Sequence, residues 1–558
     1  MRSVIEQIRS SIEEGLGLAL EKLARDLQLE TLPQVILERP NQRVHGQWAS
    51  NLALTITKQA KLPPRQIAQL LMENFHDRSG LVQRIEIAGP GFLNFHLSPA
   101  WRAEAVAEIL AQGDRFGSCD IGRQEKVLLE FVSANPTGPL HVGHGRGAAV
   151  GSALASILQA AGYQVTCEFY LNDAGNQINK FSHSLEVRYR QALGQDVQLP
   201  EDGYHGEDLA ELMARLAAEK QDSLLALPEP ELRKALVSYA LPLKVAAIRR
   251  DLEEFGVRFQ SWFRESSLHP AAIEEAVGEL KDRGQLYEND GALWLRSTDF
   301  GDDKDRVVIR DNGVPTYLAA DIAYHKDKYD RGYDRLVNIW GADHHGYIAR
   351  IKAAARSLGY DPEKLSIIIV QMVNLFRDGQ AVIMSKRTGQ LVTLSEIVEE
   401  VGKDSARFFF LMRSSESQLD FDLDLAKEQS DRNPVFYVQY AHARICSILR
   451  QAREQGVEPP AAGVEPLSLL KTPEEELLME ELAQLPLVVG EAASRMEPHR
   501  LAHYAQELAG QFHLFYNRCR VLGAEEELQG ARLLLISASR TVLAKTLSLL
   551  GISAPERM

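Results

Sequence analysis

The feature that most constrains this fold is a strand–loop–helix–strand pattern between residues 126 and 170. Residues 127–132 read Val-Leu-Leu-Glu-Phe-Val, a short apolar run that is typical of a buried strand. A loop rich in proline and glycine follows, then a helix expected over about 145–161 and a second strand over 164–170. Elements in this order begin a parallel α/β sheet, because the helix returns the chain to the end at which the first strand began, so that the second strand runs in the same direction.

The chain of 558 residues divides into three blocks, and no internal repeat is visible. Residues 1–120 are predicted to form a small α+β domain, with strands over 82–87 and 92–97 joined by a tight turn. Residues 121–415 are predicted to form a Rossmann-type parallel-sheet domain with a charged helical insertion over about 185–285. The remaining residues, 416–558, are predicted to form an all-α bundle, so the fold class is multidomain α/β.

Other local patterns make specific structural predictions. The apolar runs 335–340 and 365–370 are expected to join the same sheet. Thr393-Leu394-Ser395-Glu396 has the pattern of a capping box that opens a helix, and Pro434 is expected to start another. The proline-rich segment 456–472 is expected to run over the surface.

Composition limits the class of protein less than the motifs do. The formal net charge of −15 disfavours a surface coated in nucleic acid, yet it permits local basic faces, so an RNA partner is neither supported nor excluded. Four cysteines without a CxxC pair argue against a zinc ribbon or a disulfide framework and suit a reducing cytoplasm. The first residues lack an apolar signal core, and polar residues interrupt the uncharged run 147–167. We therefore expect no membrane segment and a cytoplasmic location.

The loop after the first strand carries the first candidate catalytic residues. Over residues 133–145 it reads Ser-Ala-Asn-Pro-Thr-Gly-Pro-Leu-His-Val-Gly-His-Gly. It lies between a strand and a helix, where open α/β sheets bind ligands and a helix N-terminus favours phosphate. His141 and His144 can both face a nucleotide there, and imidazole N–H donors would stabilise charge that develops on an α-phosphate. Gly143 would let the adenine or ribose approach the backbone closely.

A second motif, Met384-Ser385-Lys386-Arg387, supplies a candidate for the other end of a nucleotide. A lysine on a loop can hold the β- and γ-phosphates and help pyrophosphate to leave, because such catalysis depends mostly on positioning and charge compensation. Gly379 and Gly389 flank the motif as candidate hinges.

In this order, the two motifs resemble the HIGH and KMSKS signatures of class I aminoacyl-tRNA synthetases. The first differs by valine in place of isoleucine. The second has Ile383 where the first lysine is expected and Arg387 in place of the last serine, so only Lys386 carries over as the phosphate clamp. Residues 143–148 also fit a dinucleotide-binding GxGxxA, but a dehydrogenase would place these glycines directly after the strand.

Longer stretches resemble the arginyl branch of this class: 130–146, 317–321, 340–347 and 433–444. This resemblance implies that Tyr317 and Asp321 hold the guanidinium of arginine, while Glu130, Ser133 and Asn135 hold its α-amino and carboxylate end. A guanidinium fork pairs best with a carboxylate that accepts two bonds, and residues four apart share one face of a helix. Taken alone, Asp321 would equally be explained as a solvated helix residue.

The stretch Asp343-His344-His345 invites a metal interpretation. No third ligand cluster accompanies it, however, and adjacent histidines point apart on a strand. We expect a pocket wall after a sheet strand, although the pattern leaves open which histidine approaches which substrate. Our assignment places Asp343 and His344 toward arginine and His345 toward ATP. The remaining ATP-binding residues expected from the two motifs are Asn135, Gly143, Gly145, Met384 and Ser385.

Two regions are expected to contact tRNA. The first block resembles the N-terminal domain of arginyl enzymes, which approaches the D-loop elbow, so Phe92 would stack on an unpaired base and Asn94 would bond to its edge. The last block resembles their anticodon-binding bundle, in which Tyr440 and Arg444 would grip splayed bases. Packing and turn chemistry also explain each of these residue types.

The reaction that the resemblance implies is arginine–tRNA ligation. The arginine carboxylate would attack the α-phosphate of ATP, with Mg²⁺ accompanying the ATP and no tightly bound metal. The arginyl group would then pass to the 2′-hydroxyl of the terminal adenosine of tRNA(Arg), leaving AMP and pyrophosphate. The resemblance further implies that tRNA must bind before arginine is activated and that no editing domain is present; we expect a monomer.

Three alternatives remain at this stage. A class I synthetase for another amino acid would share the ATP motifs and differ at Tyr317 and Asp321. A small-molecule nucleotidylyltransferase would not need a helical C-terminal block. A non-catalytic tRNA-binding paralogue would have lost His141, His144 or Lys386, all of which are present.

Overall fold

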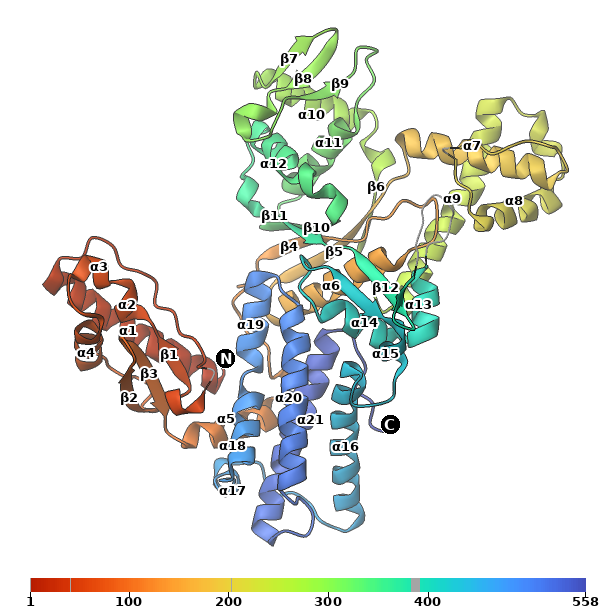
Figure 1. The fold of residues 1–558 in the computed structure, drawn as a ribbon. Coiled ribbons are helices and arrows are strands. Elements are labelled where there is room, and N and C mark those ends of the chain that lie inside the picture. Colours follow the sequence, from red (N-terminus) through yellow and green to blue (C-terminus); the bar gives the residue numbers. More distant parts are fainter. Residues whose placement is uncertain (1, 41, 202, 383–391) are drawn as a thin grey trace.

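The computed structural model describes residues 2–40, 42–201, 203–382 and 392–558. Figure 1 shows a central sheet with a helical bundle below it, in blue, and a small mixed region to one side, in red. A group of three helices, α7 to α9, projects from the other side of the sheet, and a mixed green region lies above it. The predicted multidomain α/β fold is therefore confirmed.

The central sheet consists of five parallel strands in the order β11-β10-β4-β5-β6. Their bounds are Lys126–Glu130 (β4), Gln164–Leu171 (β5), Ser261–Arg264 (β6), Arg335–Gly341 (β10) and Leu365–Val370 (β11). A parallel sheet that is covered on both faces needs apolar strands, and Val127, Leu128 and Leu129 of β4 are at most 1% exposed. The prediction that 335–340 and 365–370 share this sheet is confirmed.

Helix α6 (Val142–Ala160) connects β4 to β5 across one face of the sheet. Its small residues allow a close approach, since a Cβ at Gly151 would lie 2.3 Å from the ring of Phe131. The helix starts earlier than the predicted residue 145, because His141 acts as its N-cap.

Helices α7 (Gly175–Ala192), α8 (Glu207–Lys220) and α9 (Glu229–Glu254) have an apolar core of their own. Strand β6 then returns the chain to the edge of the central sheet. The segment expected as an insertion over 185–285 therefore includes one strand of the central sheet, which corrects the prediction. Strand β6 has only four residues, and their sequence shows no pattern that would have identified them as a strand.

The mixed region above the sheet contains α10 (Ala271–Asp282), the antiparallel strands β7 (Leu286–Asn289), β8 (Ala292–Leu295) and β9 (Arg306–Ile309), and α11 (Tyr317–Asp330). After β10 come the short 3₁₀ helix η6 (Ala342–Tyr347) and α12 (Ile348–Ser357). The buried face of α11 packs near the sheet, so this helix brings side chains to the ends of β4 and β10.

The N-terminal region combines helices α1 (Val4–Leu27) and α4 (Pro64–Glu73) with an antiparallel sheet in the order β1-β3-β2. Its strands are Trp48–Ser50 (β1), Val82–Ala88 (β2) and Phe92–Leu97 (β3). The predicted strands 82–87 and 92–97 are confirmed. Helix α5 (Ala100–Gln112) follows and packs against the C-terminal bundle.

The C-terminal part is helical, apart from the short strands β12 (Val373–Arg377), β13 (Gln380–Ala381) and β14 (Leu419–Asp422) that precede or interrupt it. Its helices are Leu394–Val401 (α13), Lys403–Leu411 (α14), Leu423–Lys427 (α15), Pro434–Glu454 (α16), Val464–Leu467 (α17), Pro473–Ala483 (α18), Leu485–Arg495 (α19), His499–Arg518 (α20) and Glu526–Leu549 (α21). The capping box at Thr393 and the start at Pro434 are confirmed. The expected surface run 456–472 is only partly correct, because Leu467 and Leu470 are buried in the core.

A buried arginine joins α6 to the segment after α14. Arg146 is fully buried, and its guanidinium donates hydrogen bonds to the carbonyls of Gln371 (2.9 Å), Ser417 (2.8 Å) and Ser414 (2.8 Å). A buried guanidinium needs such acceptors, because an unpaired charge in the interior is costly.

All four cysteines are unpaired. Among the described residues, every helix is too short or too polar to cross a lipid bilayer.

Candidate active site

The two histidines of the first motif lie together at the start of α6. Their rings stack, with centroids 3.7 Å apart. His141 Nδ1 accepts from the Gly143 N–H (3.2 Å), and His144 Nδ1 accepts from the His141 N–H (3.2 Å), so the pair forms a reciprocal capping box. Because both Nδ1 atoms accept, a neutral imidazole carries its proton on Nε2. Each ring can therefore act as a hydrogen-bond donor, as the predicted catalytic role requires.

The chain that follows the second motif returns to the first. Thr393 forms a β-bridge with His141, the Val142 N–H donates to the Val392 carbonyl (3.2 Å), and the Leu394 N–H donates to the Leu140 carbonyl (2.8 Å). Met384, Ser385 and Lys386 themselves lie outside the described residues. In the sequence, Val392 follows Lys386 by six residues.

Glu130 ends β4 and is held by two partners. Its carboxylate accepts from the Ser133 hydroxyl (2.8 Å) and from the Lys328 ammonium, and Ser133 Oγ in turn accepts from the Tyr170 N–H (3.1 Å). Val132 and Ser133 have φ values of 68° and 43°. Side chains with a Cβ rarely adopt such angles, and a branched Val least of all, so the turn is strained at the point where Ser133 meets Glu130.

Tyr317 and Asp321 share one face of α11, as predicted. Tyr317 is 48% exposed, whereas Asp321 is partly buried. Burial is the main cause that raises the pKa of Asp321 to about 7; a hydrogen bond from the Tyr347 hydroxyl lowers the pKa, and the nearby charges of Glu265 and Glu130 add to the rise. A carboxyl group with a raised pKa is a candidate for binding a cation, since a bound guanidinium would restore its charge. The alternative of a solvated helix residue does not fit this environment.

Sequence reasoning missed two neighbours of Asp321. Glu265, directly after β6, is 4% exposed, and burial raises the pKa of its carboxyl group. Tyr347, at the end of η6, donates to Asp321 and carries the Arg350 guanidinium 4.2 Å from its ring centroid. Tyr347 lies within the stretch 340–347 that the sequence had singled out, but Glu265 had no such signal.

The histidines after β10 are not on a strand. Asp343, His344 and His345 form part of η6, and all three are exposed. His344 Nε2 lies 3.7 Å from the Asp343 carboxylate, and its ring centroid is 6.0 Å from that of Trp340. The position after a sheet strand agrees with a pocket wall, but the argument from strand geometry was wrong, because a 3₁₀ turn replaces the strand. Their roles toward arginine and ATP stay predictions.

The remaining loop residues differ in their surroundings. Asn135 is exposed and Gly143 half-buried, so both remain open to a ligand. Gly145 is buried, and a Cβ there would lie 2.8 Å from Leu394 Cδ1 and 3.3 Å from Phe410 Cε2. This glycine is therefore needed for helix packing, and its predicted contact with ATP has no support from the geometry.

The residues expected to contact tRNA also differ in their exposure. Phe92 at the β2–β3 turn is 38% exposed, but Asn94 is only 3% exposed within the N-terminal sheet. Burial favours a packing role for Asn94, because a base edge could not reach its amide. On α16, Arg444 bonds to the Tyr440 hydroxyl and lies 5.2 Å from the ring centroids of both Tyr440 and Tyr516. This half-buried cluster of aromatic and basic groups has the character of a base-stacking surface.

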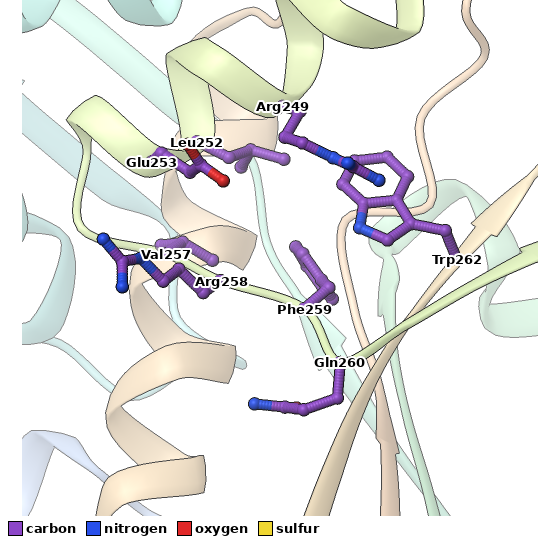
Figure 2. A pocket seen from close by; sticks show the side chains of 8 residues that line it. All are labelled: Arg249, Leu252, Glu253, Val257, Arg258, Phe259, Gln260 and Trp262. Atoms are coloured by element: carbon purple, nitrogen blue, oxygen red, sulfur yellow. The ribbon is translucent and has the colours of Figure 1, made fainter.

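Figure 2 shows a separate pocket of about 300 Å³ between the end of α9 and the start of β6. The Arg249 guanidinium lies 4.7 Å from the ring centroid of Trp262 there, and Phe259 lies beneath. The pocket is at the amino end of its strand, whereas Glu130 and the loop to His141 follow the carboxyl end of β4. It is therefore distinct from the candidate active site. The described residues contain no cluster of three or more His, Cys, Asp or Glu side chains suited to a metal ion.

A parallel sheet whose first crossover begins with His-Val-Gly-His, bonded to the segment after Met-Ser-Lys, defines the catalytic domain of a class I aminoacyl-tRNA synthetase. Family models agree: the class I (R) tRNA synthetase catalytic domain matches residues 105–411, the arginyl tRNA synthetase N-terminal domain matches 6–97, and the DALR anticodon binding domain matches 438–558.

Individual proteins are similar along the whole chain. An arginine–tRNA ligase of Carboxydothermus hydrogenoformans is 51% identical over 560 residues, covering 100% of both chains. The arginyl-tRNA synthetase structure of Thermus thermophilus has a TM-score of 0.79 at 25% identity, covering 99% of this chain and 100% of its own. A Campylobacter jejuni structure titled a putative arginyl-tRNA synthetase has a TM-score of 0.75 at 36% identity, covering 83% and 100%. The chain belongs to the arginyl-tRNA synthetase family and acts as an arginine–tRNA ligase.

Proposed function

We propose that ATP lies across the carboxyl edge of the sheet, between the histidine pair and Lys386, while arginine extends from Glu130 to Asp321. The observation that supports this proposal is the set of backbone bonds between 140–142 and 392–394, because they join the first nucleotide motif to the segment that follows the second in the sequence. The Nε2–H donors of His141 and His144 would stabilise charge on the α-phosphate as the arginine carboxylate attacks it. Class I synthetases use ATP, and Mg²⁺ would enter with it as part of the substrate.

At the arginine end, Tyr317 and Asp321 would hold the guanidinium, with Asp343 and His344 on the pocket wall. Glu130, Ser133 and Asn135 would hold the amino and carboxylate groups. Lysine would be rejected, because a site built for a planar fork of donors leaves buried acceptors unpaired when the ligand lacks that fork.

The arginyl-adenylate would then esterify the 2′-hydroxyl of the terminal adenosine of tRNA(Arg), with tRNA bound before activation. Residues 1–120 would approach the tRNA elbow through Phe92, residues 121–415 would carry the chemistry, and residues 416–558 would hold the anticodon near Tyr440 and Arg444. We further propose a monomer in the cytoplasm, a reducing compartment that four unpaired cysteines suit.

Pyrophosphate exchange with each amino acid, with and without tRNA, tests this proposal. Exchange is expected with arginine and with no other amino acid, and only when tRNA is present. Exchange driven by another amino acid would refute the substrate assignment, whereas full exchange without tRNA would refute only the requirement for tRNA.

The matched site test is Asp321→Asn. This change should raise the KM for arginine by roughly tenfold to a hundredfold, the value of a hydrogen bond to a charged group, and leave the KM for ATP nearly unchanged. Equal effects on the two substrates would count against the guanidinium role.

A further inference from the structure

A buried lysine lies behind the arginine site, and none of the motifs accounts for it. Lys328 of α11 has no exposed surface. Its ammonium donates to the Glu130 carboxylate and to Asn338 Oδ1 (2.7 Å), and it lies 4.4 Å from the ring centroid of Tyr324. A lysine is rarely buried completely, so its three donors and its charge must be matched by these neighbours.

The hydrogen bonds continue from Lys328 to the guanidinium end of the site. Asn338 Nδ2 donates to His325 Nε2 (3.0 Å), and His325 Nδ1 donates to the backbone carbonyl of Asp321 (2.8 Å). Each donor meets an acceptor, which fixes the neutral tautomer of His325 and the orientation of the Asn338 amide. Asn338 has no exposed surface and His325 is 5% exposed, so water does not compete for these bonds.

Resting on the proposed role of Glu130, we propose that Lys328 is a positioning residue for the α-amino end of arginine. It acts through Glu130: the ammonium holds one carboxylate oxygen while Ser133 holds the other, so the group keeps one orientation before the substrate arrives. Lys328 does not itself touch the substrate. Each charge of the pair also gives the other a partner, since a buried ion without a partner would be strongly disfavoured.

The test compares arginine with 5-guanidinopentanoate, which lacks only the α-amino group, in equilibrium dialysis with the full-length protein. Lys328→Met should weaken arginine binding roughly tenfold or more, the value of a hydrogen bond to a charged group, and change binding of the analogue less than about twofold. Lys326→Met is the matched control, since Lys326 lies on the same helix but pairs with Glu275 (3.0 Å) and Asp330 (2.7 Å) at the surface. This control should bind both ligands as the parent protein does.

The variant Glu130→Gln separates this inference from the proposed function. If Glu130→Gln weakens the binding of arginine but not of the analogue, the role of Glu130 stands. Lys328→Met must then also weaken the binding of arginine, and the two changes together must cause no further loss. Equal weakening of both ligands by Lys328→Met, or additive effects in the double variant, would overturn the positioning role alone. No selective effect of Glu130→Gln would overturn both assignments.

The double variant also keeps the proposal testable if Lys328→Met alone does not fold. Removal of both charges together leaves no unpaired ion, so the Lys328→Met, Glu130→Gln protein should fold. It should bind arginine as weakly as Glu130→Gln alone, and a further loss of tenfold would overturn the proposal.

Discussion

The raised pKa of Asp321 predicts that arginine binds more weakly in acid. With a pKa of about 7, this carboxyl group is ionised in about 90% of molecules at pH 8 and in about 10% at pH 6. Apparent affinity scales with the fraction of the competent form, so the Kd for arginine should rise about tenfold between these values. Equilibrium dialysis of arginine without ATP avoids the titration of the nucleotide. Calorimetry at pH 6.5 in two buffers should show release of about 0.8 proton per arginine bound.

The unliganded protein should show the linked effect on folding. Because burial raises the pKa of Asp321 from 3.8 to about 7, the folded protein keeps a proton that the unfolded chain gives up. Stability from this group is thus fully present below about pH 4 and is lost as the pH rises to 7. Asp321→Asn should flatten both the binding profile and this part of the stability profile. A Kd that changes less than twofold from pH 8 to pH 6 would refute the reasoning.

Other predictions concern α6 and its packing. His141→Asn keeps an N-cap acceptor, so the free energy of unfolding should change by less than about 1 kcal/mol, while aminoacylation falls roughly a hundredfold from loss of a ring donor; an active variant would contradict the catalytic role. Gly145→Ala should lower the melting temperature, because overpacking against Leu394 and Phe410 costs about 1–3 kcal/mol, and an unchanged melting curve would argue against a packing role. Arg146→Met leaves three partly buried carbonyls without their donor and should cost about 1–3 kcal/mol in urea unfolding; an unchanged free energy of unfolding would show that water replaces the guanidinium.

The parts of the fold that follow from local chemistry were predictable. The apolar runs became strands of one sheet, Thr393 and Pro434 started helices, and the spacing of Tyr317 and Asp321 placed them on one helix face. Each of these depends on neighbours within about one turn of helix or one strand, which the sequence displays directly.

The parts that depend on tertiary contacts were not predictable from one sequence. In the sequence, Lys328 has the pattern of an ordinary surface lysine on a charged helix. It is nevertheless completely buried, beside Glu130 from a distant part of the chain and Asn338 from strand β10. The burial of Asn94 depends on pairing with β1 and β2, and the role of Gly145 depends on Leu394. Hydrophobic periodicity carries no information about these neighbours.

The three carbonyls around Arg146 have a mechanical consequence. They lie in the turn after β11 and in the link that follows α14, whereas Arg146 itself is two residues beyond His144 on α6. A rotation of that link must therefore either carry α6 with it or break bonds to a charged group. A force applied to the bundle would thus reach His141 and His144 as a displacement of the helix that carries them.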